Sequence, residues 1–252
     1  MTLFCSVQGK GENLVLLHGW GMNSAVWEGV LPYLQADYRV HCIDLPGHGA
    51  SGDVEAGLDA WLNALEAVLP EQFYLCGWSL GGMLALALQQ RWPERVQGLV
   101  MIGASPRFLA GDDWPAQSPE DLRAFAQRLQ SDVKATLKQF VGLQFLGVKD
   151  ARTAVRTVLA GLQEQGEVNE AGLQQGLSLL QSLDLREAFA EQACAVLLGT
   201  QDRLVPAALA PAIRDLNPAA AIEVWSGCGH APHLAQPQAV ARFIHQHLAG
   251  GA

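Results

Sequence analysis

The stretch Cys76-Gly77-Trp78-Ser79-Leu80-Gly81-Gly82 matches the pattern G-x-S-x-G around its serine. The apolar residues 73–76 ahead of it are typical of a buried strand, and the Leu- and Ala-rich residues 83–90 behind it predict a helix. A serine between a strand and a helix, with glycine on both sides, is typical of a nucleophile elbow, in which a tight turn projects the hydroxyl above the sheet edge. The alternative is a glycine-rich turn whose serine has no chemical role, and the strand and helix around it favour the elbow.

Strands and helices alternate along most of the chain. The predicted strands occupy residues 14–17, 38–43, 73–76, 99–102, 195–199 and 222–225. The predicted helices run from Asn23 or Ser24 to about residue 34, and over residues 58–69, 83–90 and 237–248. This alternation predicts an α/β fold with a mainly parallel central sheet and helices on both of its faces.

The alternation stops after Ala104, where the sequence predicts helices only. These helices cover residues 118–130, 133–146, 151–163 and 170–183. Because predicted strands resume at residue 195, we interpret residues 105–185 as a helical cap inserted into a core formed by residues 1–104 and 186–252. A separate helical domain is the alternative interpretation.

Composition limits the class of protein. Half of the residues are hydrophobic, yet no apolar run approaches the length of a membrane span. The first residues lack a basic segment followed by an apolar one, and the five cysteines are scattered without a C-x-x-C pair, so we expect a reduced, cytoplasmic protein. A net charge of −9 argues against non-specific nucleic-acid binding. We expect a monomer that binds neither nucleic acid nor membrane.

A serine nucleophile needs a base, and the base needs a group that orients it. In elbow enzymes the acid follows the serine in the chain and the histidine comes last. Asp202, just past strand 195–199, is the predicted acid, and His230, just past strand 222–225, is the predicted base. The weaker alternatives, which lie farther from a strand end or in or near a predicted helix, are His233, Asp184 and Asp215. Cys228, two residues before His230, is interpreted as a small buried residue that could also line the site.

Two backbone amides are needed to bind the oxyanion that forms during acyl transfer. One is predicted to be the amide of Leu80, the residue after the serine. The other is predicted to be the amide of Trp20, in the loop His18-Gly19-Trp20-Gly21 after the first long strand. His18 could be a second base, but we expect it to hold that loop by hydrogen bonds.

Several segments together resemble a known family. They are Leu16-Leu17-His18-Gly19-Trp20-Gly21-Met22-Asn23, Asp44-Leu45-Pro46-Gly47, Gly77-Trp78-Ser79-Leu80-Gly81-Gly82, Pro93-Glu94-Arg95-Val96, residues 140–144 and Gly229-His230-Ala231-Pro232. With three motifs in the right order at strand ends, the chain resembles the α/β-hydrolases. Within them it is similar, along nearly its whole length, to the pimeloyl-acyl-carrier-protein methyl ester esterases of biotin synthesis.

The resemblance implies an α/β-hydrolase fold and a serine carboxylesterase without a metal or an organic cofactor. It implies Ser79, Asp202 and His230 as the catalytic triad, with the amides of Trp20 and Leu80 in the oxyanion hole. It further implies that Trp20, Ser79 and Phe140 contact the substrate, and that the substrate is bound to acyl carrier protein. The chain departs from the family where two arginines are expected ahead of Phe140, because Lys134 and Lys138 are found nearby instead.

Basic residues exceed acidic ones between residues 120 and 160, in a protein that is acidic overall. Lys149, Arg152 and Arg156 are spaced three and four apart, so a helix would present them on one face. We interpret this face as a docking surface for the acidic carrier protein, and an ordinary solvated face is the alternative.

Other functions remain open. A general short-chain carboxylesterase, or another hydrolase with the same triad, is the first alternative. A ligand-binding module that keeps the fold but turns over slowly is an alternative from a different class. Dehalogenases and epoxide hydrolases of this fold have an aspartate where Ser79 stands.

Overall fold

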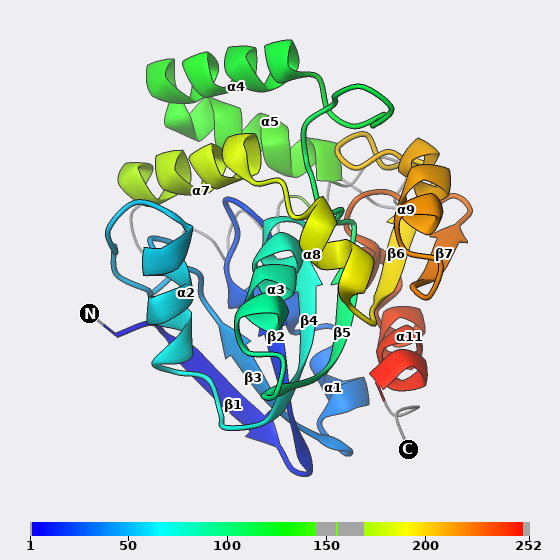
Figure 1. The fold of residues 1–252 in the computed structure, drawn as a ribbon. Helices are drawn as coiled ribbons and strands as arrows, with labels where there is room; N and C mark the ends of the chain where they lie inside the picture. The colour runs from blue at the N-terminus through cyan, green and yellow to red at the C-terminus, as the bar shows by residue number, and fades with distance from the viewer. Residues whose placement is uncertain (1, 145–154, 156–168, 249–252) are drawn as a thin grey trace.

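A central sheet runs through the molecule in the computed structural model, which describes residues 2–144, 155 and 169–248 (Figure 1). The strands are β1 Cys5–Gly9, β2 Glu12–Leu17, β3 Tyr38–Ile43, β4 Phe73–Trp78, β5 Val96–Ile102, β6 Ala195–Gly199 and β7 Ala221–Trp225. Their order across the sheet is β1-β3-β2-β4-β5-β6-β7. β1 is antiparallel to β3, and the other neighbouring strands are parallel. The predicted α/β fold with a mainly parallel sheet is therefore confirmed.

The burial of the strands follows their place in the sheet. The last four residues of β2, β4 and β5 are all buried, as expected for central strands covered on both faces. The edge strand β1 is half-buried to exposed and pairs only with β3. The sequence analysis missed β1 because an exposed edge strand shows no continuous apolar run.

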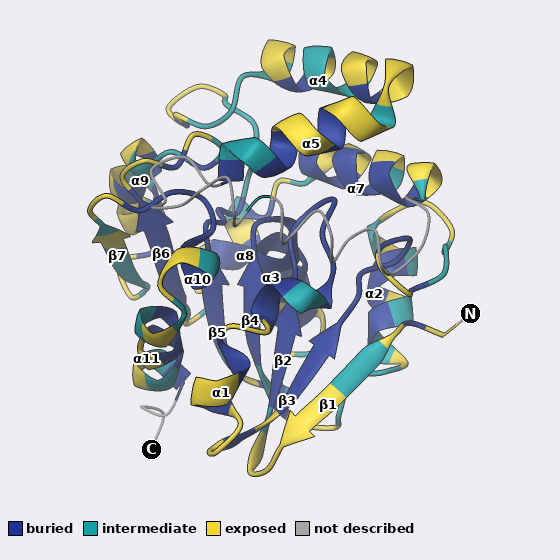
Figure 2. Ribbon diagram, turned by 180° about the vertical axis from the view of Figure 1, so that it is seen from behind, coloured by how far each residue is buried: buried dark blue, intermediate teal, exposed yellow. Residues whose placement is uncertain are grey.

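Helices cover both faces of the sheet (Figures 1 and 2). α2 Leu58–Glu66, α3 Leu80–Arg91 and α8 Arg186–Glu191 lie on one face, whereas α1 Leu31–Leu34 and α11 Pro237–Leu248 lie on the other. Two further short helices, α9 Ala210–Leu216 and α10 Pro232–Ala235, follow β6 and β7. The helix predicted from residue 23 or 24 to residue 34 is in fact two, the 3-10 helix η1 Ser24–Trp27 and α1. Pro32 has no N–H to donate to the preceding turn, so a continuous helix would lose a hydrogen bond there.

Three helices lie across the carboxyl ends of the strands (Figure 1). They are α4 Pro119–Ser131, α5 Val133–Gln144 and α7 Glu170–Ser182. Where this segment leaves and rejoins the sheet, Arg107 pairs with Asp184, and the Leu185 N–H donates to the Pro106 carbonyl over 2.8 Å. The helix predicted over residues 151–163 lies outside the described residues except for the helical residue Val155. The division into a core and an inserted cap at residues 105–185 stays a prediction.

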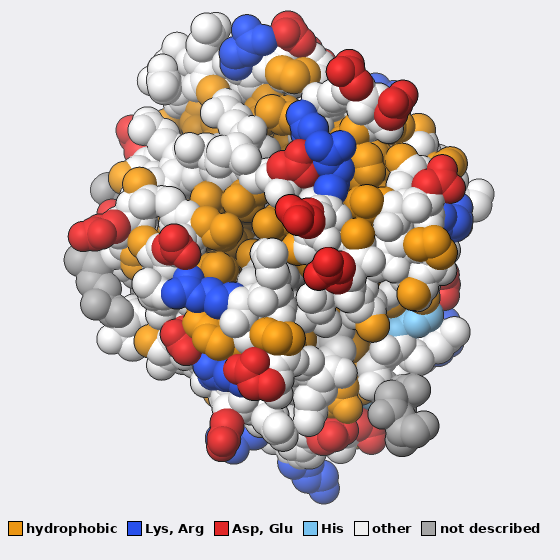
Figure 3. Space-filling model, in the orientation of Figure 1, with side chains coloured by type: hydrophobic (Ala, Val, Ile, Leu, Met, Phe, Trp, Pro, Cys, Tyr) orange, Lys and Arg blue, Asp and Glu red, His pale blue; other side chains and the backbone are white. Residues whose placement is uncertain are grey.

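Charged side chains on the face covered by α2, α3 and α8 are of mixed sign. Figure 3 shows acidic and basic side chains interspersed there, with hydrophobic side chains between them. Within the described ranges, no helix is both long enough and apolar enough to cross a membrane.

Candidate active site

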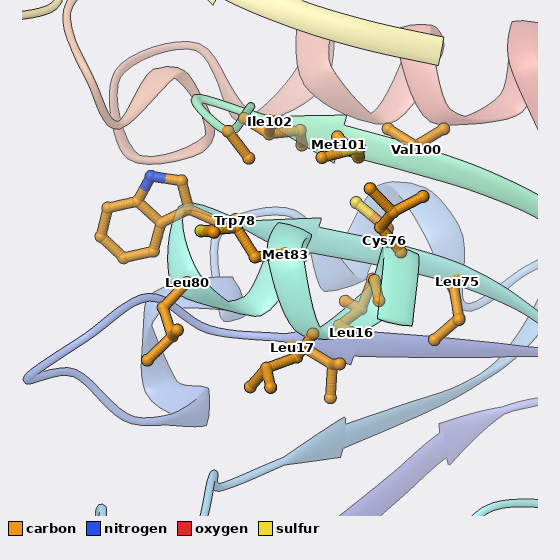
Figure 4. Packing of buried hydrophobic residues seen from close by; sticks show 14 of the residues in the cluster. Leu16, Leu17, Leu75, Cys76, Trp78, Leu80, Met83, Val100, Met101 and Ile102 are labelled. Atoms are coloured by element: carbon orange, nitrogen blue, oxygen red, sulfur yellow. The ribbon is translucent and has the colours of Figure 1, made fainter. Parts of the chain in front are cut away.

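Ser79 lies between β4 and α3 in a strained backbone conformation. Its φ is 55° and its ψ is −120°, a region that residues with a side chain rarely adopt. The turn is closed so tightly that a Cβ on Gly77 would collide with the Gly81 carbonyl, and a Cβ on Gly81 would collide with the Leu17 carbonyl. Both glycines are therefore required by the geometry of the elbow. Figure 4 shows the buried side chains of β2, β4 and β5 packed around this turn.

Asp202 and His230 meet at the same edge of the sheet. Asp202 follows β6 and His230 follows β7, and the two neighbouring strands are parallel. The His230 Nδ1 lies 2.8 Å from Asp202 Oδ2, and both side chains are almost fully buried. The other carboxylate oxygen, Oδ1, accepts the N–H groups of Leu204 and Val205 over 2.8 and 2.9 Å. The carboxylate is thus fixed on the backbone and accepts the His230 Nδ1–H.

The remaining ring nitrogen of His230 is available. Nε2 is buried and has no hydrogen-bond partner in the part of the chain that the structure describes. The backbone of His230 is held by Trp78, whose indole N–H donates to the His230 carbonyl over 2.8 Å. Since Trp78 directly precedes Ser79, this bond ties the histidine loop to the elbow.

The competing residues have other partners. His233 is buried between the rings of Trp27 and Trp78, at centroid distances of 4.6 and 4.5 Å, and burial lowers its pKa to about 3. Asp184 pairs with Arg186 over 2.6 Å and with Arg107 over 3.3 Å. Asp215 is exposed on α9. The structure therefore pairs His230 with Asp202, and among the described residues none of these three hydrogen-bonds to either of them.

The two residues with the predicted oxyanion amides are both close to Ser79. A Cβ built on Gly19 would be 3.1 Å from the Cβ of Ser79, so the loop containing Trp20 passes close to the serine. Leu80 is the first residue of α3, where the amides have no partner within the helix and the helix dipole is positive. Within the described residues, neither the Trp20 nor the Leu80 amide donates a hydrogen bond.

His18 is a structural residue of the same loop. Its Nε2 accepts the Leu45 N–H over 2.9 Å, so its Nδ1 carries the proton and donates to the Gly19 carbonyl over 2.8 Å. The ring is fully buried, and burial lowers its pKa. His18 thus holds the loop by hydrogen bonds, as the sequence analysis expected.

A cavity of about 150 Å³ is lined by Ser79 and by residues of α4, α5 and α7. Its apolar wall includes Trp20, Phe108, Leu122, Phe125, Phe140 and Leu177. In addition to Ser79, its polar lining residues are Gln117, Asp121 and Arg128. The predicted substrate contacts Trp20, Ser79 and Phe140 therefore line one cavity, which suits an apolar chain with a polar group at one end.

Several contacts of the site could not be predicted from the sequence. The Trp78 bond to His230 joins residues 152 positions apart, and Phe125, together with the predicted Phe140, meets the Trp20 ring from α4 and α5. No local pattern signals such contacts. The predicted docking residues Lys149, Arg152 and Arg156 lie outside the described residues. Among the residues that are described, no group of three or more His, Cys, Asp or Glu side chains could hold a metal ion.

Comparison with known proteins adds independent information. A model of the alpha/beta hydrolase family matches residues 14–243. The pimeloyl-[acyl-carrier protein] methyl ester esterase of Aeromonas hydrophila is 40% identical over 247 residues, covering 96% of this chain and 97% of that protein. The enzyme of the same name from Nitrosomonas europaea is 38% identical, covering 94% and 96%. An esterase structure from Exiguobacterium antarcticum superposes with a TM-score of 0.89 at 21% identity, covering 98% and 96%, and supports the fold.

Proposed function

Because the chain belongs to the alpha/beta hydrolase family, we propose that it is a serine carboxylesterase acting on the methyl ester of pimeloyl-acyl carrier protein. The substrate follows from relatives of that name, which are 37–40% identical over nearly the whole chain. The chemistry rests mainly on one observation, the buried pair of His230 and Asp202 with Nε2 left unpartnered.

The proposed first half-reaction forms an acyl-enzyme. Ser79 Oγ attacks the carbonyl carbon of the methyl ester while His230 Nε2 takes the hydroxyl proton. The negative charge that develops on the carbonyl oxygen is bound by the amides of Trp20 and Leu80. His230 then gives its proton to the departing methoxide, so that methanol leaves and the acyl group stays on Ser79. Asp202 keeps the Nδ1–H tautomer and stabilises the imidazolium.

The proposed second half-reaction releases the acid. His230 takes a proton from water, and the hydroxide attacks the ester of Ser79 through a second oxyanion in the same hole. Collapse of this intermediate returns the proton to Ser79 Oγ and frees the new carboxylate. These steps use side chains, backbone amides and water alone.

The cavity supports a narrow acyl substrate. At about 150 Å³ it is below the roughly 300–1,000 Å³ typical of pockets for drug-sized ligands. Its wall is mostly leucine and phenylalanine, which suits the methylene chain between the ester and the carrier. The polar lining residues Gln117, Asp121 and Arg128 suit the amide-rich arm that links the chain to its carrier.

The partner that we propose is acyl carrier protein, with the enzyme acting as a cytoplasmic monomer. Lys149, Arg152 and Arg156 remain our proposed docking face. The exposed Lys134 and Lys138 of α5 are the nearest described basic residues along the sequence. Exposed charges change mainly the association rate and its salt dependence. Reversal of Arg152 and Arg156 to Glu should therefore lower kcat/KM for the carrier-bound ester at low salt and leave p-nitrophenyl acetate unaffected. An equal loss on both substrates would instead indicate a structural role.

The main test uses purified protein and the Ser79→Ala variant. Wild type should convert the carrier-bound methyl ester to the free acid, seen as a mass loss of one methylene group, and should restore growth of a biotin-requiring strain that lacks this esterase. Ser79→Ala should remain folded and lose on the order of a million-fold in kcat. A general short-chain esterase would hydrolyse p-nitrophenyl acetate yet fail to restore growth. A slow-turnover binding module would give a burst without steady turnover.

A further inference from the structure

Trp20 connects its own loop, residues 18–21, to α4, α5 and α7. Its indole N–H donates to the Leu173 carbonyl of α7 over 2.7 Å, although the two residues are 153 positions apart. Its ring also meets Phe125 of α4 and Phe140 of α5 edge-on, at centroid distances of 5.3 and 4.9 Å. The side chain is 1% exposed, and apart from the face that lines the cavity it is packed against these helices. A displacement of the ring would therefore strain the loop that carries the Trp20 amide.

Gly176 of α7 lies directly on this ring. A Cβ built on Gly176 would be 2.9 Å from Trp20 Cδ1 and 3.4 Å from Trp20 Nε1. The same Cβ would be 3.3 Å from Leu80 Cδ2. Trp20 and Leu80 are the two residues whose amides are proposed to bind the oxyanion. One buried glycine therefore lies against the side chains of both of these residues.

We propose that Gly176 is a positioning residue of the esterase, which lets α7 rest on Trp20 and Leu80 and so fixes the two oxyanion amides. The inference rests on the proposed function, because it takes those amides as the oxyanion donors. The packing explains why position 176 needs glycine: an added methyl group would overlap the Trp20 ring, which Phe125 and Phe140 prevent from yielding.

A displaced oxyanion hole has a distinct kinetic signature. The amides bind most strongly when the carbonyl oxygen becomes charged, so their displacement lowers kcat and leaves KM little changed. The effect should be found with p-nitrophenyl acetate, whose short acyl group makes little use of the cavity wall. The displacement should also weaken the binding of butylboronic acid, which forms a tetrahedral adduct with a catalytic serine and places an oxygen in the oxyanion hole.

The test compares Gly176→Ala with Gly142→Ala. Gly176 is in α7 and Gly142 is in α5, but a Cβ on Gly142 would meet none of the described residues within 4 Å. Loss of a complete oxyanion donor costs about 100- to 1,000-fold in kcat, so a displaced pair is expected to cost about tenfold. Gly176→Ala should therefore lose about tenfold in kcat on p-nitrophenyl acetate and bind butylboronic acid about tenfold more weakly. Gly142→Ala should match wild type in both measurements.

Other outcomes would overturn the inference. They are a wild-type kcat in Gly176→Ala, a loss confined to the carrier-bound ester, and a lower melting temperature with unchanged boronate affinity. If Gly176→Ala does not fold, Trp20→Phe takes its place. This substitution removes both the bond to the Leu173 carbonyl and the edge of the indole that lies against Gly176, so it should show the same signature, and a wild-type signature would reject the inference. If wild-type activity depends on Ser79 while Gly176→Ala has normal kinetics, only this inference is rejected. If Ser79→Ala is still active, the proposed function is rejected as well.

Discussion

Two clusters of buried histidine and aspartate lie at strand ends on opposite sides of Ser79, and their hydrogen bonds differ. On one side, His230 and Asp202 follow β7 and β6, and the carboxylate lies 2.8 Å from the ring. On the other side, His18 and Asp44 follow β2 and β3. Asp44 is fully buried, and its carboxylate accepts the backbone N–H groups of Ser24 and Ala50 over 2.7 and 2.8 Å.

The histidines of the second cluster are also bound to the backbone. His18 lies between the Leu45 amide and the Gly19 carbonyl, and His48 Nδ1 lies 2.9 Å from the Pro46 carbonyl. The two rings are 5.5 Å apart, and burial lowers the pKa of His48 to about 3. Residue type and burial are thus alike in the two clusters. Only the first gives a histidine both a carboxylate on one nitrogen and an open second nitrogen, which is what a general base requires.

The largest expected effect separates the bases. His230→Ala should lose on the order of a million-fold in kcat, because it removes the proposed general base of Ser79. His48→Ala should lower stability by about 2–4 kcal/mol through lost packing, and keep kcat within a few-fold of wild type. Steady-state kinetics with p-nitrophenyl acetate and urea unfolding of both variants measure the two effects. If His48→Ala were inactive and His230→Ala active, the general base would belong to the second cluster instead of the first.

The aspartates should differ by about as much. Asp202→Asn keeps the shape but favours the wrong tautomer of His230, and should lower kcat about 10,000-fold without unfolding the protein. Asp44→Asn replaces one acceptor oxygen by an amide group facing a backbone N–H, and should cost about 1–3 kcal/mol of stability. Its kcat should stay far above that of Asp202→Asn. Comparable rate losses in the two variants would show that Asp44 belongs to the catalytic machinery.

Much of this arrangement could be predicted from local signals. The elbow, the central strands and the positions of Asp202 and His230 follow from short apolar runs and the turns behind them. In the sequence, only its shorter distance from the strand end favours His230 over His233. The structure gives the physical reason, because the His230 ring meets a carboxylate whereas the His233 ring lies between two tryptophans.

The rest depends on packing between distant segments. Trp20 and Leu173 are far apart in sequence, and nothing near either residue indicates the bond between them. The tight fit of Gly176 against Trp20 cannot be distinguished in sequence from the open surroundings of Gly142, because both are single glycines in helical segments. The exposed strand β1 was missed for a related reason, since only its pairing with β3 defines it.

The smallest expected effect concerns the buried rings that stay neutral. The pKa values of His48 and His233 are each about 3, below the ordinary 6.5, because burial disfavours the charged ring. Above pH 6.5 both rings are neutral in the folded and the unfolded chain. As the pH falls below 6.5 the unfolded chain binds protons that the folded protein does not, so the free energy of unfolding decreases toward pH 3. At about pH 5 each ring should reduce it by about 2 kcal/mol.

His233→Phe isolates one of these rings. Phenylalanine cannot titrate, and it keeps an aromatic ring between Trp27 and Trp78, so the variant should fold and hydrolyse p-nitrophenyl acetate within a few-fold of wild type. Its unfolding free energy in urea should decrease by about 2 kcal/mol less than that of wild type between about pH 7.5 and about pH 5. Equal decreases in the two proteins would mean that His233 takes up its proton as readily folded as unfolded. The ring would then have access to water or to a partner. A large loss of kcat in His233→Phe would mean that His233 is the base. His230 would then not be the general base, and the distinction between the two clusters, which depends on His230, would be wrong.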